Sequence, residues 1–367
     1  MKTILLSLAA AALLNAAPLG LPELHVPEAN ELTPKKVELG QLLFFDPRFS
    51  RDGTISCATC HDPDKAFTDQ LPVSVGIEGK KGTRNAPTVI NAAYNKSQFW
   101  DGRVPTLAEQ AKFPPINPVE GGLHSWDEVV AKIKADPNYV KMMKEVFGVQ
   151  KDAITIDHFA NAIEAFEMTV ISGNSPFDRW YFGGEEDAMS EEQKRGFALF
   201  VGKGRCVECH TISQTYALFT NNKFHNLGVG WQKIKDDLPK VVQAFKVAKV
   251  KAHDKAIAED EAALMNAKFS ELGRYVVTGE IDDIGAFKTP TLRNVELTFP
   301  YMHDGSLQTL EEVIVWYNNG GRLSPQDPKS PFIDGGIRKL NLTAEEIEDL
   351  VAFLKALTSP QFKRSQK

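Results

Sequence analysis

The chain has 367 residues, a formal net charge of −6 and four cysteines. This length suits two domains, each large enough to bury a core of its own. The acidic balance argues against nucleic acid as a partner, and no stretch after the N-terminal segment approaches transmembrane length.

The N-terminal segment is typical of a secretion signal. Lys2 supplies a positive charge, and an apolar run from Ile4 to Ala17 follows that is too short to span a bilayer. Small residues around Ala16 and Ala17 suit signal peptidase. We therefore predict a signal peptide over residues 1–17, with a buried N-terminal helix as the alternative.

All four cysteines belong to two Cys-x-x-Cys-His motifs, formed by Cys57, Cys60 and His61 and by Cys206, Cys209 and His210. At this spacing two thiols can add to the vinyl groups of one haem, and the adjacent imidazole can ligate its iron. A zinc site of four thiolates would leave both histidines unexplained, and paired CxxC disulfides are redox motifs rather than structural links. We predict two covalently bound c-type haems and, because bacteria attach such haems outside the cytoplasm, a periplasmic protein.

The expected helices are marked by apolar periodicity or by capping boxes, in which two side chains satisfy the first backbone groups of a helix. In chain order they are a helix ending near Phe45, a helix over 157–171, and helices that begin at Ser190, Thr309 and Thr343. Gly320 and Gly321 should stop the fourth of these. Strand signals are short and scattered, so the fold class is mainly α with long irregular loops.

The two motifs lie about 150 residues apart, and each follows a similar apolar helix. This arrangement predicts two cytochrome c-like haem domains, over residues 18–185 and 186–367, joined near Gly183 and Gly184. Residues 234–270 differ, because Lys and Asp alternate with Ala and Val there. We interpret them as a solvated helical insertion in the second domain.

Further blocks make the chain similar to the bacterial di-haem cytochrome c peroxidases and their MauG-like relatives. The blocks are spread over nearly all of the mature chain: Leu43–Arg48, Arg84–Thr88, Phe99–Arg103, Asn117–Glu120, Lys288–Val295 and Pro300–Gly305. The resemblance implies that peroxide binds at the N-terminal haem, with His61 as its proximal ligand. It also implies that electrons pass through the C-terminal haem, with His210 as its proximal ligand.

The resemblance also implies roles around the peroxide site. Gln110, Pro114 and Glu120 correspond to distal-pocket residues, and Trp100 corresponds to the tryptophan between the haems. Glu120 would move a proton between the peroxide oxygens, a task for which a carboxylate in a poorly solvated pocket is suited. Taken without the resemblance, Glu120 could be a helix cap or salt-bridge partner, Gln110 a surface amide and Trp100 a core residue.

The resemblance further implies a calcium ion between the haems. Asn85, Thr298 and Pro300 correspond to the residues around that ion. Side-chain and backbone oxygens of this kind are suitable calcium ligands.

One departure from the family concerns the N-terminal haem. Ordinary members carry a histidine in the loop before the Arg84 block, and it caps the iron until reduction elsewhere releases it. Ile77 stands at that place, and no histidine lies between His61 and His124. We therefore expect an N-terminal iron that is open to peroxide from the outset, although His124 could swing in.

A second departure concerns the C-terminal haem. Ordinary members supply a methionine as its distal ligand, whereas this chain has Tyr317, as MauG-like proteins do. A phenolate lowers the potential of a haem, and a thioether raises it. Tyr317 also falls on the buried stripe of its helix with Leu310 and Ile314, so it could be core, and Met302 is the competing ligand.

Three functions stay open at this point. The first is a peroxidase that reduces hydrogen peroxide with electrons from a small cytochrome c or cupredoxin. The second is a MauG-like oxidase that uses peroxide to modify Trp or Tyr of a partner protein, although Gly204 and Arg205 replace the tryptophan that MauG uses as a relay. Trp180 and Trp231 are the substitutes or simply packing residues. The third, a non-catalytic electron carrier, fits an open iron poorly.

Overall fold

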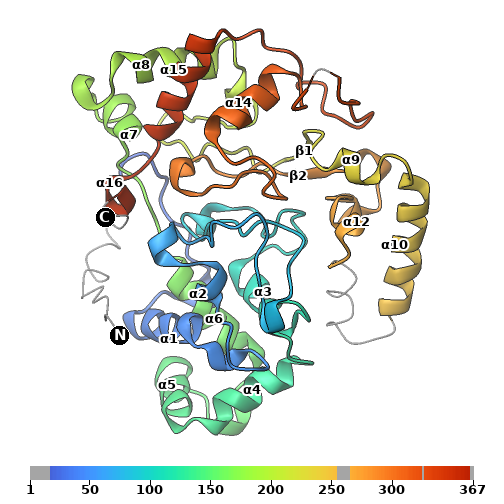
Figure 1. Ribbon diagram of the computed structural model, residues 1–367. Helices are drawn as coiled ribbons and strands as arrows, with labels where there is room; N and C mark the ends of the chain where they lie inside the picture. Colours follow the sequence, from blue (N-terminus) through green and yellow to red (C-terminus); the bar gives the residue numbers. More distant parts are fainter. Residues whose placement is uncertain (1–16, 254–264, 325, 364–367) are drawn as a thin grey trace.

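The computed structural model describes residues 17–253, 265–324 and 326–363, so nearly all of the expected signal peptide lies outside the described residues. The mainly α fold is confirmed (Figure 1). The α-helices of this part are α1 (Pro34–Phe45), α2 (Cys57–Cys60), α3 (Leu107–Ala111), α4 (Trp126–Ala135), α5 (Pro137–Phe147), α6 (Ile156–Glu167), α7 (Pro176–Tyr181), α8 (Glu191–Val201), α9 (Trp231–Ile234), α10 (Leu238–His253), α12 (Ala267–Ser270), α13 (Tyr275–Thr278), α14 (Leu310–Asn318), α15 (Ala344–Lys355) and α16 (Pro360–Lys363). Strands β1 (Phe224–Asn226) and β2 (Ala286–Lys288) pair antiparallel, with Phe224 opposite Lys288.

The first half of the chain is built on the crossing of α1 and α6. A Cβ atom at Gly40 of α1 would lie 1.8 Å from the carbonyl oxygen of Ala162 in α6, so only glycine allows this approach. Phe44, one turn further on, is fully buried in the core that both helices share. This crossing sets the position of the chain that leads from α1 to the first cysteine motif.

The second half repeats the arrangement with α8 and α15. A Cβ atom at Gly196 would lie 1.9 Å from the carbonyl oxygen of Asp349, and Phe200 is buried one turn later. The predicted capping boxes at Ser190 and Thr343 open these two helices. The same glycine-to-phenylalanine spacing thus precedes both cysteine motifs.

The two halves exchange elements across their boundary. Phe177 of α7 packs in the core of the second half, although it precedes residue 185, and Phe362 of α16 packs in the core of the first half. Arg293 and Asp178 form a fully buried ion pair, and Arg293 also donates to the carbonyl of Gly20 near the N-terminus. The division of the chain at residues 185 and 186 stays a prediction.

Two helix ends refine the sequence-based expectations. The helix expected over 157–171 ends at Glu167, because the side chain of Asn91 binds both backbone groups of Ser172 and draws the chain out of the helix. The capping box at Thr309 opens α14, which ends just before Gly320 and Gly321, both at positive φ.

The described parts of the segment over 234–270 contain α10 and α12, and one face of α10 is buried. Val241 and Phe245 of α10 pack against Leu272 and Tyr275, which forms a small third core at the edge of the molecule (Figure 1). The interpretation as a wholly solvated insertion was therefore wrong for this face, because apolar residues four apart meet the helix turns that follow. Residues 254–264 lie outside the described residues. Within the described part, no helix is both long and apolar enough to cross a membrane.

We expect Gly196→Ala to lower the free energy of unfolding by about 1–3 kcal/mol, because the added methyl group overlaps the Asp349 carbonyl and forces α8 away from α15. The matched control is Gly335→Ala, whose methyl group meets no atom within 4 Å. Thermal unfolding of the two holoproteins measures the difference. Equal melting temperatures would contradict the close crossing.

Candidate active site

The first cysteine motif is one helical turn, α2, followed by the histidine. Thr59 and Ser56 close this turn, with the Ser56 N–H donating to the Thr59 hydroxyl at 3.0 Å. The Nδ1 atom of His61 lies 3.2 Å from the carbonyl oxygen of Phe67. Because a carbonyl can only accept, Nδ1 carries the proton and Nε2 keeps its lone pair. Burial lowers the pKa of His61, which favours this neutral form.

The second motif holds its histidine in the same way. Nδ1 of His210 lies 2.9 Å from the carbonyl oxygen of Phe219, and burial lowers the pKa of His210 to about 4. Each half of the chain therefore presents one neutral imidazole whose Nε2 is ready to ligate a metal. This is the donor that iron takes in a c-type haem site.

None of the four cysteines forms a disulfide, and burial raises the pKa of the Cys60 and Cys206 thiols to about 12. Within the described ranges, no three cysteine thiols converge as a zinc site would require. The alternative of a four-thiolate zinc site is therefore contradicted. Free thiols beside a neutral imidazole are the donor set that haem attachment needs.

One cluster of acidic and histidine side chains in the described chain has the spacing of a metal site, but a lysine already pairs with it. Glu271, His303 and Asp304 place their ligand atoms within 4.8 Å of one another. Lys233 binds Glu271 at 2.7 Å and Asp304 at 2.8 Å, while His303 bonds to Glu271 and stacks on Phe287. The cluster is a salt-bridge network that joins α9 and the end of α12 to the loop at His303 and Asp304.

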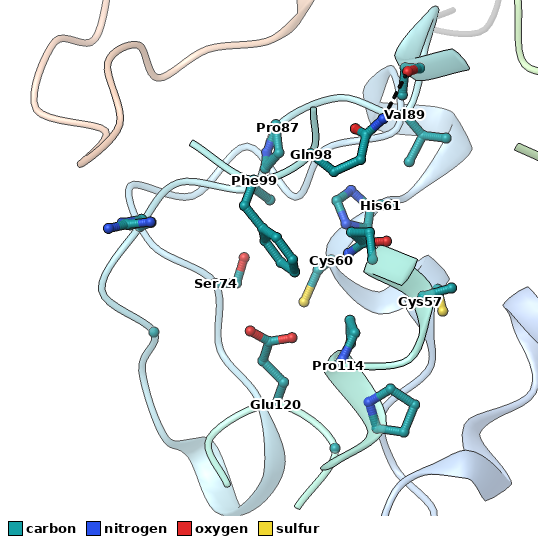
Figure 2. Close-up of a pocket in the computed structure, with 18 of the residues that line it drawn as sticks. Cys57, Cys60, His61, Ser74, Pro87, Val89, Gln98, Phe99, Pro114 and Glu120 are labelled. Carbon is teal, nitrogen blue, oxygen red and sulfur yellow. Dashed lines mark hydrogen bonds between the residues drawn. The ribbon is translucent and has the colours of Figure 1, made fainter. Parts of the chain in front are cut away.

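A cavity of about 220 Å³ opens beside the first motif (Figure 2). Its walls are largely apolar and include Leu43, Phe49, Phe99, Phe159 and Ile163.

Glu167 also lines this cavity. Its Oε2 atom is buried and meets no partner among the described residues, and burial raises the pKa of its carboxyl to about 8. Apolar walls, two thiols, an imidazole and an unsatisfied polar atom together fit a haem.

The three residues expected in the distal pocket, Gln110, Pro114 and Glu120, all line this cavity, and so does Trp100, the tryptophan expected between the haems. Figure 2 shows the Glu120 carboxylate pointing toward the Cys60 thiol, with Pro114 beside it. The amide of Asn117 donates to Oε1 of Glu120 at 3.1 Å and holds the carboxylate in place. The catalytic roles of these residues stay predictions.

Trp100 lies where the two halves meet. Its indole N–H donates to the carbonyl of Asn85 at 2.9 Å. Its own carbonyl accepts from the N–H of Lys288 at 2.8 Å. These two bonds fix the tryptophan against both the first and the second half of the chain.

The loop that contains Ile77 lies against the segment that carries Glu120. Ile77 is fully buried and packs on Gly122, and its N–H donates to the carbonyl of Glu120 at 3.1 Å. An aliphatic side chain cannot ligate iron. His124 is exposed and does not line the cavity.

The expected calcium residues are linked through one short stretch of chain. The side-chain nitrogen of Asn85 donates to the carbonyl of Leu71, so the side-chain oxygen of Asn85 is left for another partner. Gln70 donates to the carbonyl directly before Thr298, and Pro300 is buried two residues further on. These oxygen donors suit a calcium ion, whose binding stays a prediction.

Tyr317 lies on α14 near the second motif. Burial and the neighbouring thiols of Cys206 and Cys209 raise the pKa of its hydroxyl well above the usual range. Its competitor Met302 lies in the turn that ends at Gly305. The proximity of Tyr317 to both thiols supports its role as the distal residue of the second haem, although ligation itself stays a prediction.

The two tryptophans considered as relays have the surroundings of packing residues. Trp180 packs edge-on against Phe197 at 5.3 Å between ring centroids, and Trp231 packs against Phe332 at 6.1 Å. A relay role for either one stays a hypothesis.

Three residues that the sequence reasoning did not select also line the cavity: Glu167, Met265 and Lys288. Lys288 is the first residue of the Lys288–Val295 block, on which the resemblance partly rests, so the sequence could have marked it as a candidate site residue. Glu167 and Met265 had no such signal, because only the fold brings them to the first motif.

Known proteins of one family are similar to this chain. The family model described as di-haem cytochrome c peroxidase matches residues 34–187. The methylamine utilization protein MauG of Methylorubrum extorquens is 38% identical over 331 residues, which are 90% of this chain and 80% of that protein. The cytochrome c551 peroxidase of Nitrosomonas europaea is 37% identical over 325 residues, which are 88% of this chain and 80% of that protein.

A solved structure of a MauG-like protein associated with microbial copper homeostasis has a TM-score of 0.75 and 32% identity, and the similarity covers 96% of this chain and 97% of that one. Fold, cysteine motifs and relatives together define an oxidoreductase with two haem groups. The chain belongs to the di-haem cytochrome c peroxidase family, and it is a di-haem peroxidase.

We propose that Tyr317 is the distal ligand of the second haem, and we expect Tyr317→Phe to change the visible and EPR spectra of that haem alone, because a phenyl ring offers no donor atom. Met302→Leu is the control and should leave the spectra as they are. A Tyr317→Phe protein with unaltered spectra would make Tyr317 a core residue, and a spectral change in Met302→Leu would identify Met302 as the ligand.

Proposed function

We propose that this chain is a periplasmic peroxidase that carries two covalently bound c-type haems and a calcium ion between them. Hydrogen peroxide is reduced in the cavity beside Cys57 and Cys60, and electrons arrive through the haem at Cys206 and Cys209. The observation that carries the proposal is the Glu120 carboxylate, which points into this cavity. The proposal also takes Ile77 to stand where ordinary members of the family carry a capping histidine.

The haem in this cavity, when bound, supplies the iron at which the peroxide O–O bond is cleaved. His61 supports it with an Nε2 lone pair, which the Nδ1 bond to Phe67 keeps available. Imidazoles oriented by a backbone carbonyl are stronger and better aligned ligands than free ones.

Glu120 handles the protons. One carboxylate oxygen would accept a proton from the peroxide oxygen nearer to the iron. It would return this proton to the peroxide oxygen farther from the iron, which leaves as water. Asn117 holds Oε1 of Glu120 at 3.1 Å, so the carboxylate does not have to reorient between these two steps. The apolar wall around Phe99 and Phe159 excludes bulk water, which would otherwise compete for the same proton.

The electron donor is expected to be a small periplasmic cytochrome c or cupredoxin. Support comes from relatives named cytochrome c551 peroxidase, which are more than 30% identical to this chain. The N-terminal apolar segment of the sequence supports export.

A second candidate function is oxidation of Trp or Tyr in a partner protein, as in the MauG-like alternative. The proximity of Tyr317 to the second motif favours it, because a tyrosine-ligated haem has a low potential and is poorly suited to accept electrons from a donor of high potential. Turnover of peroxide with a reduced cytochrome c would support the peroxidase, whereas peroxide consumption without donor oxidation would support the partner oxidase.

We expect Glu120→Gln to slow the reaction with peroxide by about 10²- to 10⁴-fold, because glutamine keeps the shape of the side chain but cannot carry the proton. Both haem spectra of the resting protein should be largely retained. Stopped-flow mixing of the oxidised holoprotein with peroxide measures the rate constant. The control is Glu109→Gln, an exposed carboxylate on α3 that pairs with Lys112; wild-type kinetics in Glu120→Gln would remove Glu120 from the mechanism.

A further inference from the structure

Lys288 is a buried lysine without an anionic partner in the described chain. It ends β2, its side chain lines the cavity beside the first motif, and the residue is 8% exposed. Its backbone N–H is bonded to the carbonyl of Trp100, so its position on the wall is fixed. Burial lowers the pKa of the Lys288 ammonium group to about 8, and no described carboxylate raises it again.

The other buried lysines of the described part have acceptors for their ammonium groups. Lys36 donates to Asn30 and to the carbonyl of Glu31, and Lys112 lies 2.7 Å from both Glu109 and Asp157. A charged group that is buried without an anion costs several kcal/mol, so proteins pair such groups or bind an anion beside them. Lys288 therefore points to an anion in the cavity.

We propose that Lys288 forms an ion pair with a propionate of the haem in this cavity, an inference that rests on the proposed haem site. A haem that is anchored through its vinyl groups at Cys57 and Cys60 carries its two propionates on the opposite edge of the ring. The thiols come from α2 in the first half of the chain, whereas Lys288 comes from β2 in the second half (Figure 1). The pair ties the first haem to the second half, next to Trp100.

The ion pair also adjusts the redox potential. Lys288 compensates the negative charge of the propionate, and an uncompensated carboxylate near the iron favours the oxidised form. Lys288 is thus a positioning residue that raises the midpoint potential of the first haem relative to the second.

The test is spectroelectrochemical titration of the full-length holoprotein, with haem counted per chain. Lys288→Gln should lower the midpoint potential of the N-terminal haem while two haems remain attached, and Lys288→Arg, which keeps the charge, should restore most of the shift. Lys96→Gln, which removes an exposed lysine, is the control and should behave as wild type. An unchanged N-terminal potential in Lys288→Gln overturns the ion pair, whereas fewer than two haems in the wild-type chain overturns the proposed function instead.

A different observation concerns Met265, at the start of the turn that leads into α12. Although it belongs to the segment over 234–270, it is half-buried and lines the same cavity. Its Sδ atom lies 3.7 Å from the amide nitrogen of Asn117, the same nitrogen that holds Glu120. One amide therefore connects a thioether to the proposed proton-transfer group.

We infer that the substrate peroxide oxidises Met265 to its sulfoxide and that this modification slows the enzyme, which rests on peroxide entering the proposed site. The sulfur attacks one peroxide oxygen, an S–O bond forms and the O–O bond breaks. The other oxygen takes up the proton released and leaves as water, so sulfur loses two electrons and peroxide gains them. The new oxygen has to fit into the 3.7 Å contact between the Met265 sulfur and the Asn117 amide nitrogen, so it displaces the amide that also holds Glu120.

Peptide mass spectrometry after peroxide treatment of the holoprotein tests this inference. Met265 should gain one oxygen well before Met142, a half-buried methionine of α5 that packs on the first core and does not line the cavity. The peroxide rate constant should fall as Met265 is oxidised, recover after treatment with methionine sulfoxide reductases, and stay constant in Met265→Leu. Equal oxidation of both methionines, or a rate that falls equally in Met265→Leu, overturns it, whereas a wild-type protein that never reacts with peroxide overturns the proposed function.

Discussion

The hydrogen bond between each haem-site imidazole and a backbone carbonyl is the interaction on which the rest of this structure depends. His61 bonds to Phe67 and His210 bonds to Phe219, and in both cases Nδ1 must be the protonated nitrogen. Each Nε2 is thereby aimed at a fixed point. Each motif follows a helix that crosses a second helix with the two backbones in direct contact, at Gly40 in the first half and at Gly196 in the second.

The two halves do not work as independent modules. The cavity beside the first motif takes its thiols and its carboxylate from the first half, but Lys288 and Met265 reach it from the second. Trp100 is bonded through its backbone to Lys288 and through its indole to Asn85. A charged group, a thioether and an aromatic ring therefore meet at the boundary between the halves, so the cavity beside the first motif depends on side chains from both.

Peroxide reduction and oxidation of a partner protein share this cavity and differ in the supply and fate of electrons. In both proposals Ile77 leaves the iron open to peroxide and Glu120 transfers the proton. The proposed ligand that separates them lies in the other half, because Tyr317, which lies near Cys206 and Cys209, would lower the potential of the second haem if it ligates the iron. The choice between the two functions is therefore a property of the second haem site and of the protein that docks there.

The sequence by itself determined the two histidine-bearing haem motifs and the helical framework. The two Cys-x-x-Cys-His motifs and the capping boxes at Ser190, Thr309 and Thr343 are local patterns, and the structure has these capping boxes. The resemblance to the family also selected Trp100, Gln110, Pro114 and Glu120, which line one cavity. Only the tertiary structure decided which side chains share a cavity with them. Lys288 and Met265 lie far from Glu120 along the chain, so their meeting depends on how the halves pack, which no periodicity or spacing records.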